Sequence, residues 1–365
     1  MNLPEPLQQV GRTHVRWKGR KFSYFGGCDY FRLATHPAVL GALRDGLKRY
    51  GLNVSASRLT TGNHALYGRL EDCLRRFFGA ETATLASSGY APNLMAAQTL
   101  AGQYSHALMD ERAHVSLVDA AQLLDCPVLK FMHRDPADLS RRLRRLGKVK
   151  PILLTDGMFS HDGGIAPLRE YLELLPKDGV VLLDDAHGAG ILGATGGGTP
   201  QHADVLRGQI IQTITLSKAF GVYGGAVLAS QAVRDAILAR SRVLVGNTPL
   251  PLPLANAAMR AINLLRSDRT FLSRLRRNAS AFKERLQARG FPVPDNSSPI
   301  FPVVANDDRD DSLLKRRLIV AGIHPPFIKY PGGPEIGYFR FVISSEHTPG
   351  QIASLVDVLL KWKDG

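Results

Sequence analysis

The stretch that decides the fold of this chain reads Thr215-Leu216-Ser217-Lys218-Ala219-Phe220-Gly221. It follows the apolar residues 210–214, and a run of this length rich in isoleucine is typical of a buried strand. Lys218 is therefore expected at the carboxyl end of a strand, just before a glycine-rich bend.

A second stretch ends in the same way. The apolar residues 180–183 are followed by Asp184-Asp185-Ala186-His187-Gly188. Open α/β sheets bind ligands at the carboxyl ends of their strands. A lysine and a carboxylate that meet there suit pyridoxal 5'-phosphate (PLP), because the amine attaches the cofactor aldehyde and the carboxylate faces the pyridinium nitrogen.

Each stretch also has other interpretations. A lysine beside a glycine turn is usually solvated, and Asp-Asp-Ala-His is compatible with an acidic turn or with the magnesium-binding box of a helicase-type NTPase. An NTPase of that kind needs the phosphate loop G-x-x-x-x-G-K-[ST]. The one Gly-Lys pair, residues 147–148, is followed by Val149, which excludes that class.

Further motifs extend the pattern along the chain. They are residues 88–93 (SGYAPN), 113–116 (AHVS), 155–163 (TDGMFSHDG), 184–193 (DDAHGAGILG) and 340–347 (RFVISSEH). In their residues and in their order along the chain, these motifs resemble those of the α-oxoamine synthases, a family of fold-type-I PLP enzymes. The resemblance runs from about Tyr30 to the C-terminus. Residues 184–190 are most similar to the 8-amino-7-oxononanoate synthase branch, which implies a role in biotin biosynthesis.

The resemblance and the alternation of apolar runs with helical patterns imply an α/β fold. We expect the fold-type-I PLP-dependent transferase architecture, a mostly parallel sheet covered by helices, with a smaller C-terminal α+β domain. The expected parts are an N-terminal arm (1–39), a large PLP-binding domain (40–266) and a small domain (267–365). Strands are expected near 82–87, 106–109, 128–132, 152–155, 180–184, 210–215, 225–229, 300–304 and 339–343, and helices near 135–147, 313–321 and 349–361.

The resemblance also implies site residues. The catalytic residues would be Lys218, His114 and Asp184. The cofactor would be bound by Ser88, Gly89, Tyr90, His114, Ser160, Asp184, His187, Thr215, Lys218 and, from a second subunit, Thr248. Arg340 would bind the amino-acid carboxylate with its planar fork. Asp185 is expected to be structural, and no metal site is expected.

The implied reaction is a decarboxylative condensation of alanine, glycine or serine with an acyl-CoA or other acyl thioester. Some positions depart from the family pattern: Cys28 replaces an asparagine, Arg32 a glycine, and Tyr67 a frequent histidine. The arginine of the family's N-terminal arm has only Arg12 and Arg16 as candidates. These departures keep an alternative open, a fold-type-I aminotransferase or lyase.

The composition of the chain argues against a nucleic-acid-binding, membrane-spanning or secreted protein. The formal net charge of the 365 residues is +14, but the basic clusters are interleaved with leucines as on solvated helix faces, and no nucleic-acid motif accompanies them. No apolar run reaches the ~18 residues of a membrane span, and the N-terminus has no signal pattern. The three cysteines lack metal-ligand spacing and favour a reducing compartment. We therefore expect a cytoplasmic protein that binds neither nucleic acid nor membrane, and the resemblance, through Thr248, implies a homodimer.

Overall fold

A computed structural model describes residues 4–329 and 334–364. The chain divides into two compact units. The large unit comprises Pro37–Phe159 and Ile165–Asp268, and the small unit comprises Met1–His36, Ser160–Gly164 and Arg269–Gly365. Most of the expected N-terminal arm therefore belongs to the same unit as the C-terminal segment. The short segment Ser160–Gly164 also belongs to this unit.

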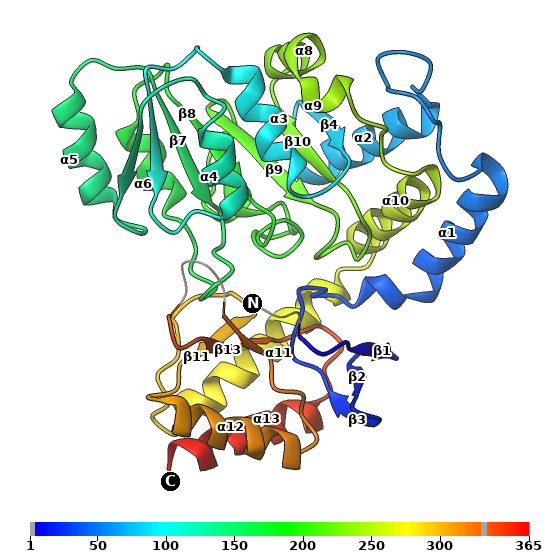
Figure 1. Cartoon of the computed structure of the whole chain (residues 1–365), viewed down its shortest axis with the longest axis vertical. Helices are drawn as coiled ribbons and strands as arrows, with labels where there is room; N and C mark the ends of the chain where they lie inside the picture. Colours follow the sequence, from blue (N-terminus) through cyan, green and yellow to red (C-terminus); the bar gives the residue numbers. More distant parts are fainter. Residues whose placement is uncertain (1–3, 330–333, 365) are drawn as a thin grey trace. The chain divides into compact units, whose positions relative to one another are not determined.

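The large unit is built on a 7-stranded sheet of order β4-β10-β9-β8-β7-β5-β6 (Figure 1). Its strands are β4 (Thr82–Ala86), β5 (His106–Asp110), β6 (Val128–Phe131), β7 (Pro151–Asp156), β8 (Val180–Asp184), β9 (Ile210–Thr215) and β10 (Gly225–Ala229). Strand β10 pairs antiparallel with both β4 and β9, and the pairs from β9 to β6 are parallel. The mostly parallel sheet expected from the sequence is confirmed.

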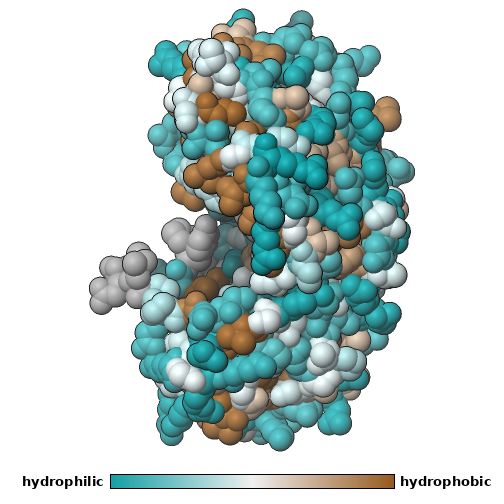
Figure 2. Space-filling view, turned by 90° about the vertical axis from the view of Figure 1, so that its right-hand side faces the viewer, coloured by the Kyte–Doolittle hydropathy of each residue, from teal (hydrophilic) through white to brown (hydrophobic). Residues whose placement is uncertain are grey.

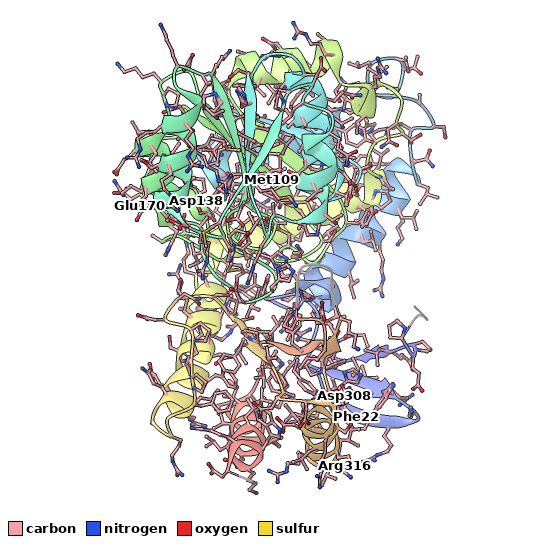
Figure 3. All side chains as sticks on the ribbon, turned by 60° about the vertical axis from the view of Figure 1, so that its left-hand side comes forward. Phe22, Met109, Asp138, Glu170, Asp308 and Arg316 are labelled. Carbon is pink, nitrogen blue, oxygen red and sulfur yellow. The ribbon has the colours of Figure 1, made fainter. Side chains whose placement is uncertain are left out.

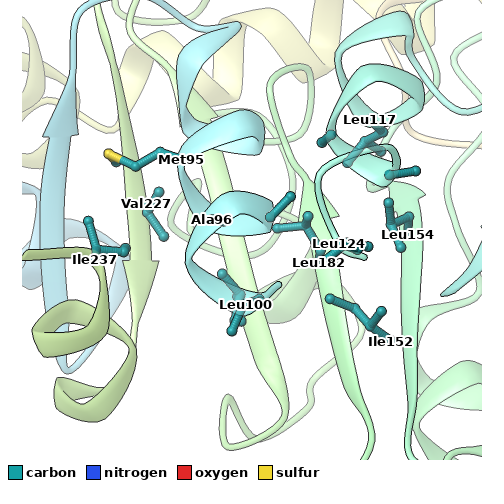
Figure 4. Packing of buried hydrophobic residues seen from close by; sticks show 14 of the residues in the cluster. Met95, Ala96, Leu100, Leu117, Leu124, Ile152, Leu154, Leu182, Val227 and Ile237 are labelled. Carbon is teal, nitrogen blue, oxygen red and sulfur yellow. The ribbon is translucent and has the colours of Figure 1, made fainter. Parts of the chain in front are cut away.

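Helices cover both faces of this sheet. They are α1 (Pro37–Tyr50), α2 (Ala65–Phe78), α3 (Ala91–Leu100), α4 (Val115–Ala121), α5 (Pro136–Leu146), α6 (Leu168–Leu174), α7 (Thr199–His202), α8 (Gln231–Arg240), α9 (Arg242–Val245) and α10 (Leu252–Ser267). On one face Leu154 and Leu182 pack against α3 and α4 (Figure 4). On the other face the neighbouring Leu153 and Leu183 pack with residues of α5 and α6. Side chains alternate across a strand, so each apolar run contributes to two cores.

The small unit has its own core around a sheet of order β11-β13-β12. Its elements are β1 (Gln8–Val10), β2 (His14–Trp17), β3 (Arg20–Ser23), η1 (Leu33–Thr35), α11 (Thr270–Gln287), β11 (Ile300–Val303), α12 (Asp308–Val320), β12 (Phe327–Ile328), β13 (Tyr338–Val342) and α13 (Pro349–Lys363). Helix α12 begins five residues before the expected Leu313, because Asp307 caps it and the first turn is acidic. The three-stranded sheet β1-β2-β3 is an element that the sequence patterns did not indicate.

Many charged residues of both units are exposed to solvent. Figure 2 shows a face on which hydrophilic residues predominate and hydrophobic ones form small groups. Asp138 in the first turn of α5 (Figure 3) binds Arg142 at 2.9 Å and Arg141 at 3.1 Å. The Arg142 hydrogen bond, with help from the Met132 amide, lowers the pKa of Asp138 to about 2. Among residues 4–329 and 334–364, no helix is long and apolar enough to cross a membrane.

Candidate active site

The candidate cofactor residues of the large unit gather at one edge of its sheet. Parallel pairing places Asp184 at the end of β8 opposite Asp156 of β7 and Thr213 of β9. Thr215 ends β9, and Lys218 follows it. Because these strands run in the same direction, their carboxyl ends meet at the edge where α/β sheets bind ligands.

Asp184 is the most firmly held member of the group. It is 4% exposed, and its Oδ2 accepts hydrogen bonds from Asn93 Nδ2 at 2.6 Å and from Ser116 Oγ at 3.3 Å. Its Oδ1 accepts from the backbone amide of Ala186 at 3.0 Å. Donors to both oxygens fix the orientation of this carboxylate.

Asn93 and Ser116 are candidate site residues that the sequence analysis did not assign, although each lies inside a quoted motif. The Asn93 side chain accepts from Thr213 Oγ1 at 2.6 Å and donates to Ser116 Oγ at 2.8 Å. Both side chains therefore join α3 and α4 to the carboxylate at the end of β8. Only the motif membership of these residues could have indicated them, since the contact spans distant parts of the chain.

The same network sets the tautomer of His114. The Ser116 backbone amide donates to His114 Nδ1 at 3.2 Å, so Nδ1 is an acceptor and the ring proton lies on Nε2. The backbone amide of His114 donates to Asp156 Oδ2 at 2.8 Å. Burial, reinforced by the nearby charge of Asp184, raises the pKa of Asp156 well above its usual range. His114 is thereby held in position as the N-cap of α4.

Lys218 and His187 come together from the two strand ends. Lys218 Nζ lies 2.7 Å from His187 Nε2, and the His187 side chain is buried. Asp185, next in sequence to Asp184, belongs to a different cluster: it accepts from the Thr199 hydroxyl at 2.6 Å and from Gln212 Nε2 at 2.6 Å. The expectation that Asp185 is a structural carboxylate is consistent with these contacts.

The backbone of Gly89 lies very close to the side chain of Thr215, beside the start of α3. A Cβ on Gly89 would lie 2.3 Å from Thr215 Oγ1, a distance that no side chain tolerates. Ser88 Oγ accepts from the Ala91 amide at 3.3 Å, and Tyr90 is the N-cap of α3. Backbone amides at a helix N-terminus beside a hydroxyl make a suitable cradle for a phosphate. Together with Lys218 and Asp184, these residues fit PLP.

Arg340 and Ser160 lie in the small unit and contact each other. Arg340 Nη1 donates to the Ser160 carbonyl at 3.2 Å, and Nη2 lies 3.9 Å from Cys28 Sγ. Within the described part of the chain, no carboxylate forms an ion pair with Arg340. Cys28, which replaces the family asparagine, therefore contacts the guanidinium expected to bind substrate.

The other departures from the family pattern have structural explanations. Tyr67 is fully buried and donates to the Leu250 carbonyl at 2.8 Å. Arg32 has φ 53°, a left-handed conformation that favours glycine, and its guanidinium donates to the Tyr24 carbonyl at 3.0 Å. Arg12 forms an ion pair with Glu346 at 2.6 Å. This candidate for the arginine of the family's N-terminal arm is therefore bound by a carboxylate of its own unit.

Thr248 is exposed in a segment next to the cofactor group of the large unit. Its neighbour Asn247 donates to Ser87 Oγ at 2.7 Å, and Thr248 lines a small cavity that Ser87 and Arg58 also line. The exposure of Thr248 is compatible with a contact to a second subunit, which stays a prediction.

Comparisons with known proteins show the family of the chain. The aminotransferase class I and II family matches residues 27–359. The chain is 33% identical to the putative 8-amino-7-oxononanoate synthase of Desulforudis audaxviator, over 98% of this chain and 93% of the relative. It is 35% identical to the 8-amino-7-oxononanoate synthase of Thioalkalivibrio sulfidiphilus, over 93% and 88%. Serine palmitoyltransferase from S. paucimobilis, solved with PLP and myriocin, is 28% identical with a TM-score of 0.90, covering 98% of this chain and 91% of that one.

The chain therefore belongs to the aminotransferase class I and II family and has the fold of the fold-type-I PLP transferases. Within that family it is a PLP-dependent acyltransferase of the α-oxoamine synthase type.

Proposed function

We propose that this enzyme condenses a small amino acid, namely alanine, glycine or serine, with an acyl-CoA thioester, in a reaction most like that of the 8-amino-7-oxononanoate synthases. A carbon–carbon bond forms between the amino-acid Cα and the acyl carbon. The carbon–sulfur bond breaks with release of the thiol, and the amino-acid carboxylate leaves as carbon dioxide. The product is an α-amino ketone.

The single observation that carries this proposal is the grouping of Lys218, His187 and Asp184 at adjoining strand ends, with Lys218 Nζ 2.7 Å from His187 Nε2. Bound PLP supplies an electron sink that makes the Cα–H bond of an amino acid acidic. Lys218 would hold the cofactor through its aldehyde and would accept the Cα proton. Asp184, held by Asn93, would face the pyridine nitrogen and favour its protonated form.

The remaining proposed residues bind and orient. Gly89 and Tyr90 amides and the Thr215 hydroxyl hold the phosphate, with Ser88 shaping the turn. His187 and Ser160 would support the phenolic edge of the ring, and His114, whose Nδ1 accepts from the Ser116 amide, would cover the ring face. Arg340 holds the amino-acid carboxylate through two parallel hydrogen bonds.

We also propose a cytoplasmic homodimer in which Thr248 reaches the phosphate of the partner's site. Closed two-fold dimers are the commonest soluble oligomers. Leu47 at 53% and Leu52 at 64% exposure are large apolar side chains that a partner subunit would cover. Cys28, Cys73 and Cys126 are all free thiols, as expected in a reducing compartment.

The test is a matrix of amino acids against acyl-CoA thioesters scored by release of free thiol. The proposal predicts thiol release that requires both substrates, with carbon dioxide formed in equal amount. Transfer of the amino group to a keto acid, without use of any thioester, would favour the aminotransferase or lyase alternative instead. The acyl chain preferred in this matrix decides whether the enzyme shares the pimeloyl donor of the 8-amino-7-oxononanoate synthases, and with it their role in biotin biosynthesis.

A further inference from the structure

Buried polar side chains of the large unit form a chain of hydrogen bonds beside the candidate cofactor residues. They are Asn93 of α3, Ser116 of α4, Asp184 of β8 and Thr213 of β9, and each is at most 4% exposed. Burial of polar groups is costly unless each of them has a hydrogen-bond partner. The direction in which these groups donate therefore determines what the chain of hydrogen bonds holds in place.

The Asn93 amide lies in the middle of this chain. Its Oδ1 accepts from the Thr213 hydroxyl at 2.6 Å, the shorter of two Thr213 contacts, since the Leu183 carbonyl lies at 3.3 Å. Its Nδ2 donates to Asp184 Oδ2 at 2.6 Å and to Ser116 Oγ at 2.8 Å. An amide nitrogen has two protons, so both are used. Asn93 is therefore the closer donor to Asp184, and it also donates to the Ser116 hydroxyl.

The Ser116 hydroxyl has one proton and two acceptors within reach. Its Oγ lies 2.7 Å from His114 Nδ1 and 3.3 Å from Asp184 Oδ2. The second distance exceeds the usual limit of about 3.0 Å for a hydroxyl that donates to oxygen. The contact with His114 is therefore the stronger of the two. Asp184 retains the shorter hydrogen bond from Asn93.

The backbone amide of Ser116 determines the direction of its side-chain contact with His114. This amide donates to His114 Nδ1 at 3.2 Å, and His114 is the N-cap of α4. A proton on Nδ1 would point at the amide hydrogen, so that two donors would face each other. Nδ1 is therefore the acceptor, and the hydrogen bonds run in one direction, from Asn93 through Ser116 to His114. Hydrogen bonds aligned in this way strengthen one another.

We propose that Ser116 is a positioning residue, which fixes the ring of His114 so that Nε2 presents a hydrogen-bond donor to an oxygen of the bound amino acid. This inference rests on the proposed function, in which His114 lies at the cofactor. Ser116 acts through His114 and not through Asp184. Without its hydroxyl, His114 would lose one of the two donors that hold Nδ1, and its ring would present Nε2 less uniformly.

The first test observes the ring nitrogens of His114 by NMR in the full-length enzyme with PLP bound and no substrate. Histidine is labelled with an NMR-active nitrogen isotope, and the His114 signals are assigned by their loss in His114→Gln. Ser116→Ala should move the Nδ1 signal to higher chemical shift, because a hydrogen bond shields an acceptor nitrogen of this kind. Ser116→Thr keeps the hydroxyl and should restore the signal.

Ser241→Ala is the matched control for the NMR comparison. Ser241 is fully buried in the same unit, and its hydroxyl caps helix α9 in place of α4. The control should leave the His114 signals unchanged. An Nδ1 signal that is the same in the wild type and in Ser116→Ala would overturn the proposal.

A double-mutant cycle tests which residue Ser116 acts through. The readout is the dissociation constant of the preferred amino acid, followed by the absorbance change of the bound cofactor. Ser116→Ala should raise this constant about fivefold, the effect of losing roughly one hydrogen bond. The increase should be absent in the His114→Gln background and persist in the Asp184→Asn background. An increase that depends on Asp184 and not on His114 would overturn the proposal.

The NMR comparison separates this inference from the proposed function, because it needs neither an acyl donor nor turnover. A His114 signal that responds to Ser116→Ala, in an enzyme that releases no thiol with any pair of substrates, would support the contact and contradict the proposed reaction. Thiol release that requires both substrates, with a His114 signal that does not respond to Ser116→Ala, would contradict the role of Ser116 alone.

Discussion

The side chains of Lys218 and His187 are in direct contact, with Lys218 Nζ 2.7 Å from His187 Nε2. The lysine follows strand β9 and the histidine follows β8, the strand next to it in the sheet. This contact joins the two stretches of sequence that first indicated a PLP site. It also holds the lysine amine at the sheet edge where Asp184 ends β8.

Asp184→Asn should leave the cofactor bound but slow exchange of the substrate Cα proton by at least ~10²-fold, the usual effect of losing a key electrostatic group. The amide keeps the size of the side chain and removes the charge that faces the ring nitrogen. The measurement is the loss of deuterium from Cα-labelled alanine, followed by NMR.

Asp185→Asn is the matched control for this experiment. Asp185 accepts hydrogen bonds from Thr199 and Gln212, and burial raises its pKa to about 6. Asp185→Asn should lower the thermal stability of the enzyme, and it should slow exchange of the substrate Cα proton less than Asp184→Asn does. Near-normal exchange in the Asp184→Asn enzyme would mean that Asp184 does not face the pyridine ring.

Arg340→Lys should raise the amino-acid KM at least tenfold and change the acyl-CoA KM less, because an ammonium cannot reproduce the bidentate fork. Steady-state kinetics with each substrate varied in turn measures both effects. Arg316→Lys, on the exposed side of α12, provides the control and should change neither KM. A loss of equal size for both substrates would argue against a carboxylate-binding role for Arg340.

The proposed homodimer predicts that two inactive variants restore each other. Lys218→Ala and Thr248→Glu chains, produced together, should recover up to about a quarter of the wild-type activity, because half of the dimers then contain one intact site. Each variant produced alone should be inactive. A fully active monomer in sedimentation analysis would remove the argument for Thr248.

His347 makes the stability of the small unit dependent on pH. Burial lowers the pKa of His347 to about 3, and its Nδ1 accepts from the Ser344 amide at 2.9 Å while Nε2 donates to the Tyr24 carbonyl at 3.0 Å. The unfolded chain binds a proton at this histidine below about pH 6.5 and the folded chain does not. Stability is therefore complete above pH 6.5 and decreases as the pH falls towards 3.

Between pH 7.5 and pH 5 this difference amounts to about 2 kcal/mol of unfolding free energy. Urea unfolding at the two pH values should show a smaller loss for His347→Gln than for the wild type, because glutamine can donate to Tyr24 and does not titrate. An identical loss in the two proteins would show that His347 accepts a proton within the fold.

Much of the large unit could be predicted because its strands are buried on both faces. Residues 180–184, 210–215 and 225–229 are rich in apolar residues, and the structure has strands over the same residues. Helix α5 was equally predictable, since Asp135 caps its start and Gly147 follows its end. Local chemistry determines these elements.

The parts that could not be predicted depend on tertiary contacts. Strands β1 to β3 are short and carry charged residues such as Arg16 and Lys21, so they have no apolar run to mark them. The antiparallel direction of β10 is not encoded in its composition. Asn93 reaches Asp184 across 91 residues of sequence, a contact that no local pattern contains.

The central claim is that Lys218 carries the cofactor, and borohydride reduction tests it most directly. The purified enzyme should be yellow, lose that colour on reduction, and yield one modified peptide that contains Lys218 when it is digested and sequenced by mass spectrometry. The Lys218→Ala enzyme should bind PLP without forming the reduced adduct. An adduct on another lysine, or a colourless protein that yields none, would contradict the account.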